Sequence, residues 1–167
     1  MNFWILVGGC LVVLVGTGAF FGAPYVPTKR RDLRRMFDAL YKLTKDDVVL
    51  DIGSGDGIVL RETRRMGAQA VGYEINPFFV LLSRVLSWGD KAVAIRWANA
   101  FTAPFPDNVT FIYAFAVGRD GKRLARKVQR EADRLHRPLL LVCYGNPLPN
   151  KEPAQTFEAY CLYRFLP

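Results

Sequence analysis

Short runs of apolar residues alternate along the chain with segments in which apolar residues recur every three or four positions. The first pattern is typical of buried strands and the second of helices that pack through one face. The apolar runs predict strands at residues 47–51, 68–74, 92–98, 109–117 and 139–144. The helical spacing predicts helices at residues 56–66, 77–87 and 124–135, and another that begins after a capping Thr28.

Strands that alternate with helices are typical of an α/β domain built on a parallel sheet. The run at 109–117 is apolar throughout, which indicates a strand buried on both faces near the centre of that sheet. Residues 101–107 contain two prolines and are too short for a crossover helix. The end of the chain, 156–165, fits two strand passes or one long strand, so we expect a Rossmann-like, mostly parallel sheet with an antiparallel last strand.

The start of the chain differs from the rest because residues 2–23 contain no charged side chain. This length is about the 20 apolar residues that cross a bilayer as a helix. A cleaved signal peptide would need a positively charged start, a shorter apolar core and small residues at a cleavage site. No Lys or Arg precedes the run, so we expect a transmembrane anchor at 1–23. A connector and helix at 24–45 then lead to the main domain at 46–167.

Positive charge is concentrated directly after the predicted anchor. Such residues stay on the cytoplasmic side of a membrane, which places the main domain there. The three cysteines, one in the anchor and two in predicted strands, indicate neither a disulfide framework nor a metal site. The basic residues of this flank are Lys29, Arg30, Arg31, Arg34, Arg35 and Lys42.

A second basic cluster, at residues 119–137, contributes to the net charge of +8. Nucleic-acid binding, attraction to anionic lipid headgroups and an ordinary solvated helix face all fit such a cluster. If the chain has a membrane anchor, binding to lipid headgroups is a better interpretation of this cluster than binding to nucleic acid. An ordinary solvated helix face explains the cluster as well as lipid binding does.

A glycine-rich turn between the first predicted strand and helix carries the strongest chemical signal. Residues 51–57 read Asp-Ile-Gly-Ser-Gly-Asp-Gly, and the second predicted strand ends at Glu74. Doubly wound α/β folds hold the ribose of a nucleotide-like cofactor with such a turn and such an acid. Turn glycines and a solvated acid are common by themselves, and only their position in a strand–turn–helix unit makes them a cofactor signature.

The spacing of the glycines decides which cofactor is expected. A dinucleotide fingerprint has the spacing G-x-G-x-x-G, whereas this turn has G-x-G-x-G and an acid, Asp51, before its first glycine. Asp51 would repel a pyrophosphate and attract a cation. S-adenosylmethionine carries an ammonium and a sulfonium and no phosphate, so it is the expected cofactor. The expected cofactor-binding residues are Asp51, Gly53, Ser54, Gly55, Asp56, Glu74, Asn76 and Asn99, of which Asn99 fits an ordinary turn equally well.

Methyl transfer requires that a nucleophile be aligned with the methyl group and that water be excluded. No nucleophile or base is evident in the sequence, so the catalytic residue is unknown. The walls of an acceptor pocket are expected at the end of the fourth strand, in the connector after the anchor and in the loop after the fifth strand. The candidate acceptor residues are Tyr25, Thr28, Tyr113, Phe115 and Tyr144.

Taken together, the segments 23–28, 51–57 and 70–77, with Leu82, Ser83, Arg84 and Trp88 beyond them, resemble a known family. It comprises the small membrane-anchored protein-lysine methyltransferases of mitochondria, which modify the ATP synthase c subunit and the adenine nucleotide translocase. The resemblance implies a seven-stranded class I methyltransferase fold, S-adenosylmethionine as donor and a lysine of a membrane protein as acceptor. The short chain without an Arg-rich presequence suggests a prokaryotic relative in a bacterial inner membrane, and a eukaryotic source would imply the mitochondrial inner membrane.

The chain departs from this family near the expected acceptor pocket. Asn99 stands where the family tends to have an acid, and 114–117 replaces a proline-containing segment. The loop at 146–149 matches its family counterpart only loosely. A small-molecule or lipid methyltransferase, or a cofactor-binding module without catalysis, therefore remains an alternative.

Overall fold

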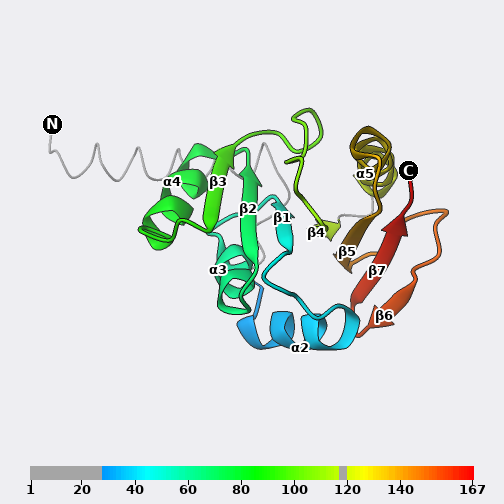
Figure 1. The fold of residues 1–167 in the computed structure, drawn as a ribbon, viewed down its shortest axis with the longest axis horizontal. Coiled ribbons are helices and arrows are strands. Elements are labelled where there is room, and N and C mark those ends of the chain that lie inside the picture. The colour runs from blue at the N-terminus through cyan, green and yellow to red at the C-terminus, as the bar shows by residue number, and fades with distance from the viewer. Residues whose placement is uncertain (1–27, 117–119) are drawn as a thin grey trace, which may run out of the picture.

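A seven-stranded sheet forms the centre of the protein, and its strands follow the order β3-β2-β1-β4-β5-β7-β6 (Figure 1). The computed structural model describes residues 28–116 and 120–167. β1 to β5 are parallel, and β7 runs antiparallel to both of its neighbours, β5 and β6, which confirms the expected sheet and resolves 156–165 into two passes. The strands are β1 (Val48–Ile52), β2 (Gln69–Glu74), β3 (Val93–Trp97), β4 (Phe111–Ala116), β5 (Leu139–Gly145), β6 (Gln155–Phe157) and β7 (Tyr160–Phe165).

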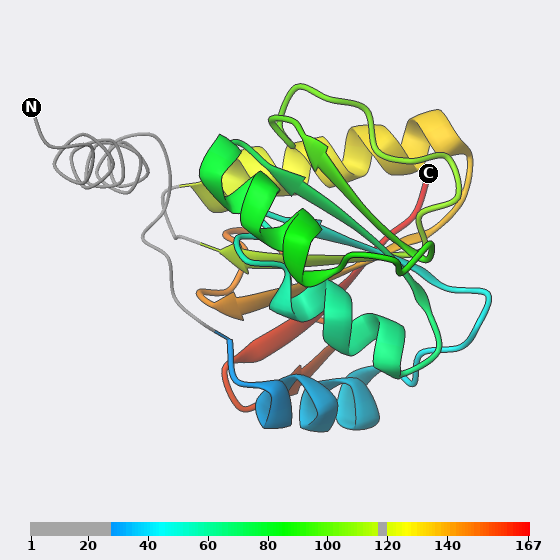
Figure 2. The same ribbon diagram turned by 90° about the vertical axis from the view of Figure 1, so that its left-hand side faces the viewer.

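Helices cover both faces of the sheet. Because crossovers between parallel strands are right-handed, the helices after β1 and β2 lie on one face and the helix after β4 lies on the other. Figure 2 shows this arrangement, with α3 and α4 in front of the sheet, α2 below it and α5 behind it. The helices are α2 (Arg30–Leu40), α3 (Ile58–Arg65), α4 (Pro77–Leu86) and α5 (Gly121–Leu135).

Alternate side chains of the central strands feed two separate cores. Val49 of β1 and Phe111 of β4 pack with α2 and α3, whereas Leu50 and Ile112 face α5. β4 is the middle strand of the sheet and is buried on both faces, as its apolar sequence predicts.

α2 is stabilised by an apolar stripe that packs on the sheet and not by a side-chain cap at its start. Lys29 occupies the N-cap position, and its side chain makes no capping hydrogen bond, so the expected cap at Thr28 is wrong. The helix is held instead by burial of its apolar face against the sheet, which provides most helical stability in proteins. The buried residues of this face are Leu33, Met36, Phe37 and Leu40.

The β3–β4 connection has no helix, as its prolines predict, and a buried ion pair of α5 holds it in place. Lys127 Nζ donates to Glu131 Oε1 at 2.6 Å and to the Ala103 carbonyl at 2.7 Å. Glu131 in turn accepts the Phe105 N–H at 3.2 Å. Lys127 is only 5% exposed, so this member of the basic cluster at 119–137 has a structural role and is not part of a solvated face.

No helix within 28–116 and 120–167 is long and apolar enough to cross a membrane. The predicted anchor at 1–23 lies outside the described residues, and so does most of the connector. Both stay predictions.

Candidate functional site

The glycine-rich turn connects β1 to α3 at the carboxyl end of the sheet. Its three glycines all have positive φ, at +76° for Gly53, +51° for Gly55 and +79° for Gly57. The N–H groups of Gly53 and Ser54 donate to the Tyr73 carbonyl at 2.8 and 3.1 Å, which fixes the turn to the neighbouring strand β2. The topology places this turn beside the point where the strand order reverses between β1 and β4, the usual ligand position in such sheets.

Glu74 ends β2 directly beside the turn, as the sequence predicts. Its Oε2 accepts the Gly55 N–H at 2.8 Å, and its Oε1 accepts the Asn76 N–H at 2.8 Å. The side chain is therefore fixed in one orientation. A carboxylate has about four lone-pair sites, so two hydrogen bonds leave acceptor capacity for the hydroxyl groups of a ribose.

Asp51 is a buried acid in an environment that disfavours its charge. Burial raises the pKa of this carboxyl well above its usual range, and repulsion by Glu74 and then by Asp56 adds to the rise. Among the residues that the structure describes, none is recorded as opposing this shift through a hydrogen bond. Asp56 is partly neutralised by Arg61 at 3.3 Å, whereas no described residue compensates Asp51. A cationic ligand group beside Asp51 would supply the missing charge, and this is the property that the ammonium of S-adenosylmethionine has.

Comparison with known proteins agrees with this geometry. Residues 50–139, from β1 to the start of β5, match the family model described as a methyltransferase domain. The chain belongs to the class I S-adenosylmethionine-dependent methyltransferases.

Several relatives of this methyltransferase carry more specific names. The lysine N-methyltransferase of the ATP synthase c subunit from Xenopus laevis is 29% identical over 91% of this chain and 70% of its own length. Its human counterpart is 28% identical over 77% of this chain and 58% of its own length. Among solved structures, an RNA methyltransferase from Salinibacter ruber in complex with S-adenosyl-L-homocysteine has a TM-score of 0.68 and 25% identity, over 84% of this chain and 92% of that one.

The remaining cofactor candidates of the methyltransferase lie around the same edge and make local hydrogen bonds. Asn76 caps α4 through its Oδ1, which accepts the Phe78 N–H at 2.9 Å. Asn99 Oδ1 accepts the Phe101 N–H at 3.0 Å, the pattern of an ordinary turn. Ser54 Oγ is buried and has no hydrogen-bond partner among the described residues. A direct contact of these three side chains with the cofactor stays a prediction.

On the other side of β1, β4, β5 and β7 contribute a group of aromatic side chains, of which Tyr113 lies beside Asp51. Tyr113 pairs in register with Asp51, so both side chains point to the α2 face of the sheet. The rings of Phe115 and Tyr144 are 5.7 Å apart, and those of Tyr144 and Tyr160 are 4.8 Å apart. The structure thus brings three of the predicted acceptor residues together. Thr28 lies next to the Tyr113 hydroxyl, while Tyr25 lies outside the described residues.

Tyr160 is the member of this group that the sequence did not indicate. It faces Tyr144 across the antiparallel β5–β7 pair, and only this register places it beside the site. The hydroxyl groups of Tyr113 and Tyr160 are buried close to each other, but neither makes a hydrogen bond of good geometry with a described residue. Burial raises the pKa of Tyr160 to about 12 and that of Tyr113 further still, so both stay protonated at neutral pH.

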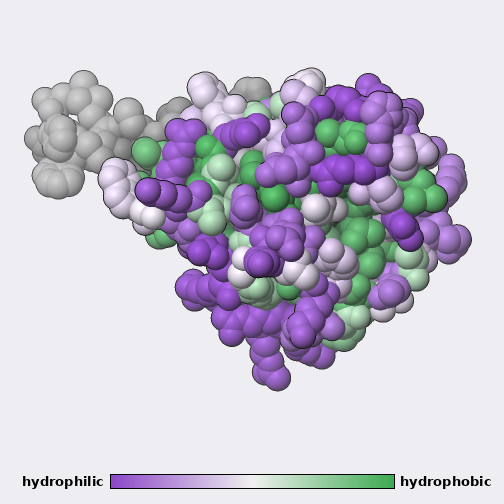
Figure 3. All heavy atoms as spheres, in the orientation of Figure 1, coloured by the Kyte–Doolittle hydropathy of each residue, from purple (hydrophilic) through white to green (hydrophobic). Residues whose placement is uncertain are grey.

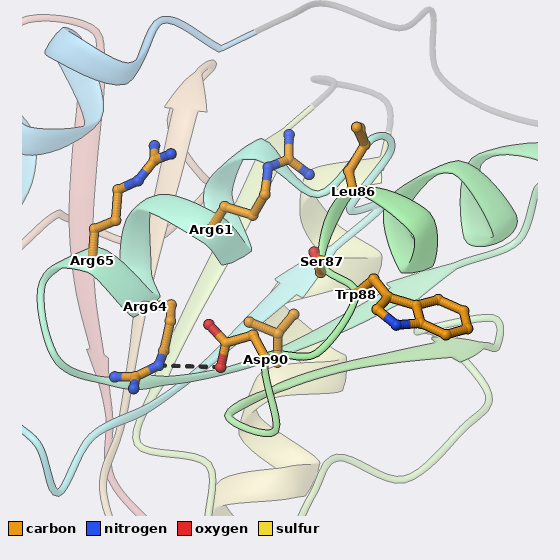
Figure 4. Close-up of a pocket in the computed structure, with 8 residues that line it drawn as sticks. Arg61, Arg64, Arg65, Leu86, Ser87, Trp88 and Asp90 are labelled. Atoms are coloured by element: carbon orange, nitrogen blue, oxygen red, sulfur yellow. Dashed lines mark hydrogen bonds and ion pairs between the residues drawn. The ribbon is translucent and has the colours of Figure 1, made fainter.

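A groove on the surface lies away from these residues (Figure 4). It is lined by the end of α3 and by the turn from α4 to β3, both of which lie near the amino ends of the strands that follow them. The cofactor candidates lie at the carboxyl ends of the strands, so this groove is not the cofactor site.

Proposed function

We propose that this methyltransferase modifies a lysine side chain of a membrane-associated protein. The observation that carries the proposal is the pair of buried hydroxyl groups of Tyr113 and Tyr160, which lack a well-formed hydrogen bond among the described residues and lie near Asp51 and aromatic rings. Aromatic faces attract an ammonium, and phenol oxygens accept hydrogen bonds from an amine. The names of the frog and human relatives support the same acceptor chemistry.

The described residues suit the two halves of such a reaction. Glu74 and the glycine turn hold the nucleoside part of the cofactor, and Asp51 attracts its ammonium. When bound, S-adenosylmethionine supplies a methyl group on a sulfonium, which is a good leaving group. The aromatic walls remove water from the incoming lysine, and desolvation lowers the pKa of an amine so that it loses its proton more easily. Tyr113 and Tyr160, being protonated, position that amine and do not act as its base.

Methyl transfer from radiolabelled S-adenosylmethionine tests the proposal. We expect label in membrane proteins, recovered as methyllysine, and a loss of about 10-fold or more in Tyr160→Phe, because an amine buried without its hydrogen-bond partner costs about 1–3 kcal/mol. Tyr41→Phe is the control, since Tyr41 follows α2 before the amino end of β1, and its hydroxyl donates to Asp47 at 3.0 Å away from the site. Equal losses in both variants, or no methyllysine, would contradict a lysine pocket at Tyr160.

RNA is a second candidate acceptor, and two observations favour it. The Salinibacter ruber protein, named an RNA methyltransferase, is similar to this chain over most of both lengths. α5 also presents exposed basic side chains, among them Lys122, Arg123, Arg126 and Arg130. The same assay therefore includes total RNA and extracted lipid as acceptors, and label confined to either of them selects that chemistry over lysine.

The proposed location follows from sequence and charge. Residues 2–23 are uncharged and long enough to span a bilayer, and the basic residues that follow favour the cytoplasmic side for the domain. In the structure, Arg30 and Arg34 pair with the buried Glu62, while Lys29, Arg31 and Lys42 remain exposed. These exposed cations suit anionic headgroups at the start of the described chain.

A further inference from the structure

α4 exposes several of its large apolar side chains, while its fully buried residues are Val80 and the small polar Ser83. Ser83 is completely buried and packs against the glycine turn, so closely that a Cβ at Gly57 would collide with its Oγ. On the opposite side, Leu81 is 64% exposed and Val85 is 57% exposed. A helix that packs on a core normally shows the reverse pattern, with its apolar stripe inside.

The exposed apolar side chains gather in one part of the chain. Trp88, just beyond α4, is 87% exposed, and Trp97 on the edge strand β3 is 69% exposed. Six of the seven large hydrophobic residues that are exposed within 28–116 and 120–167 lie in this segment. We name this set the α4 surface: Ile75, Leu81, Val85, Leu86, Trp88 and Trp97. Figure 3 shows apolar atoms among polar ones over the end of the molecule where Figure 1 places α4.

Positive charge borders the α4 surface. The groove of Figure 4 has Leu86 and Trp88 on one side and Arg61, Arg64 and Arg65 on the other. Each of these arginines has an acidic partner: Asp56 for Arg61, Asp90 for Arg64 and Glu62 for Arg65. Glu62 is shared with Arg30 and Arg34, so positive charge remains in excess around it. Arg84 projects from α4 itself and is also exposed.

We infer that the α4 surface lies in the interface of an anionic lipid bilayer. Tryptophan favours the boundary between headgroups and acyl chains, and helices with an apolar face and arginines beside it lie in that plane. Anionic headgroups complement the arginines of the groove and the net charge of +8. A second copy of the chain would bring like charges together at this place, which disfavours self-association.

The inference goes beyond the proposed function and rests neither on the lysine acceptor nor on the predicted anchor. Its consequence concerns orientation. α4 runs from Pro77, close after Glu74, to the groove near the amino end of β3, so a bilayer that lies along α4 also passes beside the cofactor edge of the sheet. An acceptor embedded in or lying on the bilayer is then within reach of the site.

Quenching of a single tryptophan by lipids with brominated acyl chains tests the inference on the full chain. Trp4, Trp88 and Trp97 are replaced by Phe, and one tryptophan is returned as Val85→Trp or as Leu166→Trp. Val85 and Leu166 are both 57% exposed, but Leu166 lies at the far end of the chain. In both variants residues 1–28 are unchanged except for Trp4→Phe, so any tethering by that segment is the same in both. Each is reconstituted in vesicles with phosphatidylglycerol or with phosphatidylcholine alone.

We expect the brominated lipid to reduce the emission of the Val85→Trp variant at least 2-fold, more with phosphatidylglycerol than without, and to leave Leu166→Trp nearly unchanged. Equal quenching of the two would show that tethering alone brings the domain near lipid. No quenching of Val85→Trp would place its surface against water or protein, and blue-shifted emission without quenching would indicate a second copy or another protein. Any of these three results overturns the inference.

Discussion

Two acids of the site, Glu74 and Asp51, lie in opposite environments. Backbone N–H groups hydrogen-bond to both oxygens of Glu74. Asp51 is buried without such bonds from the described part of the chain, and Glu74 and Asp56 repel its charge. The carboxylate of Glu74 is therefore oriented to accept further hydrogen bonds, whereas the charged form of Asp51 needs a nearby cation to stabilise it. The two residues are therefore tested by different experiments, ligand binding for Glu74 and pH-dependent stability for Asp51.

Replacing Glu74 by Ala should weaken S-adenosylmethionine binding by about 1–3 kcal/mol, the usual cost of losing a hydrogen bond to a charged group. Isothermal titration calorimetry measures the change. Glu152→Ala is the control, because Glu152 is an exposed acid away from the glycine turn. Unchanged affinity in Glu74→Ala would remove this residue from the ribose site.

Asp51→Asn should stabilise the cofactor-free protein at neutral pH and weaken its response to cofactor. The folded state holds the Asp51 proton to a higher pH than the unfolded chain does. Its contribution to the free energy of unfolding is thus complete below the pKa of an unfolded aspartate and is lost as pH rises through the folded pKa. Asn does not ionise, so the variant does not lose this stability as pH rises. Its melting midpoint at pH 7 should therefore be about 2–4 °C higher, which corresponds to roughly 1 kcal/mol for a protein of this size.

Thermal melts between pH 4 and 8, with and without S-adenosylhomocysteine, measure both effects of Asp51→Asn. We expect a flatter pH profile and a smaller ligand-induced shift than in the parent protein. Asp46→Asn, at an exposed acid, should change neither. A variant that melted lower at pH 7 and kept the full ligand shift would show that the Asp51 charge is already compensated.

At the scale of elements, the contact between the glycine turn and α4 is the tightest link of the cofactor edge. Gly57 has a φ of +79° and lies against Ser83, while Gly67 has a φ of +94° and open space around it. An alanine at either position bears the strain of a left-handed backbone, about 1–2 kcal/mol, but only at Gly57 does it also crowd a helix.

Gly57→Ala should therefore lower the free energy of unfolding by about 1–3 kcal/mol more than Gly67→Ala, the range for overpacking a core. Urea unfolding measures the difference. Adding Ser83→Ala should restore part of the loss, since it removes the oxygen that the new methyl group meets. Equal effects of the two glycine variants would mean that α4 moves away without cost.

The ion pair of α5 is a second link between elements. Lys127→Ala would leave the buried Glu131 with Arg134 at 2.8 Å as its remaining cation and the Ala103 carbonyl without a donor. We expect a loss of about 3 kcal/mol in urea unfolding, the lower end for breaking a buried pair. Lys122→Ala, exposed on the same helix, should change stability by less than about 0.5 kcal/mol. Similar effects would show that Lys127 is solvated in solution.

At the scale of the whole molecule, we expect the N-terminal segment to provide membrane attachment and the domain to bind the cofactor independently of it. Deletion of residues 2–23 should move the protein from the membrane pellet to the supernatant at high salt and leave its affinity for S-adenosylmethionine within about 2-fold, because affinity is set by groups that touch the ligand. Centrifugation and calorimetry measure the two outcomes. A deletion variant that stays in the pellet at high salt would place the main anchor elsewhere, and lost affinity would tie the segment to the site.

The sequence by itself determined the order of elements and the chemistry of the cofactor edge. Apolar period and glycine spacing are local properties, so the strands, the turn at 51–57 and Glu74 could be predicted from neighbouring residues alone. The tertiary structure decided which distant groups meet. Tyr160 reaches Tyr144 only through the β5–β7 register, and Lys127 is buried because the β3–β4 connection packs on α5. Val85 stays exposed because α4 turns Val80 and Ser83 inward. Each of these depends on contacts between segments far apart in the chain, which no local pattern encodes.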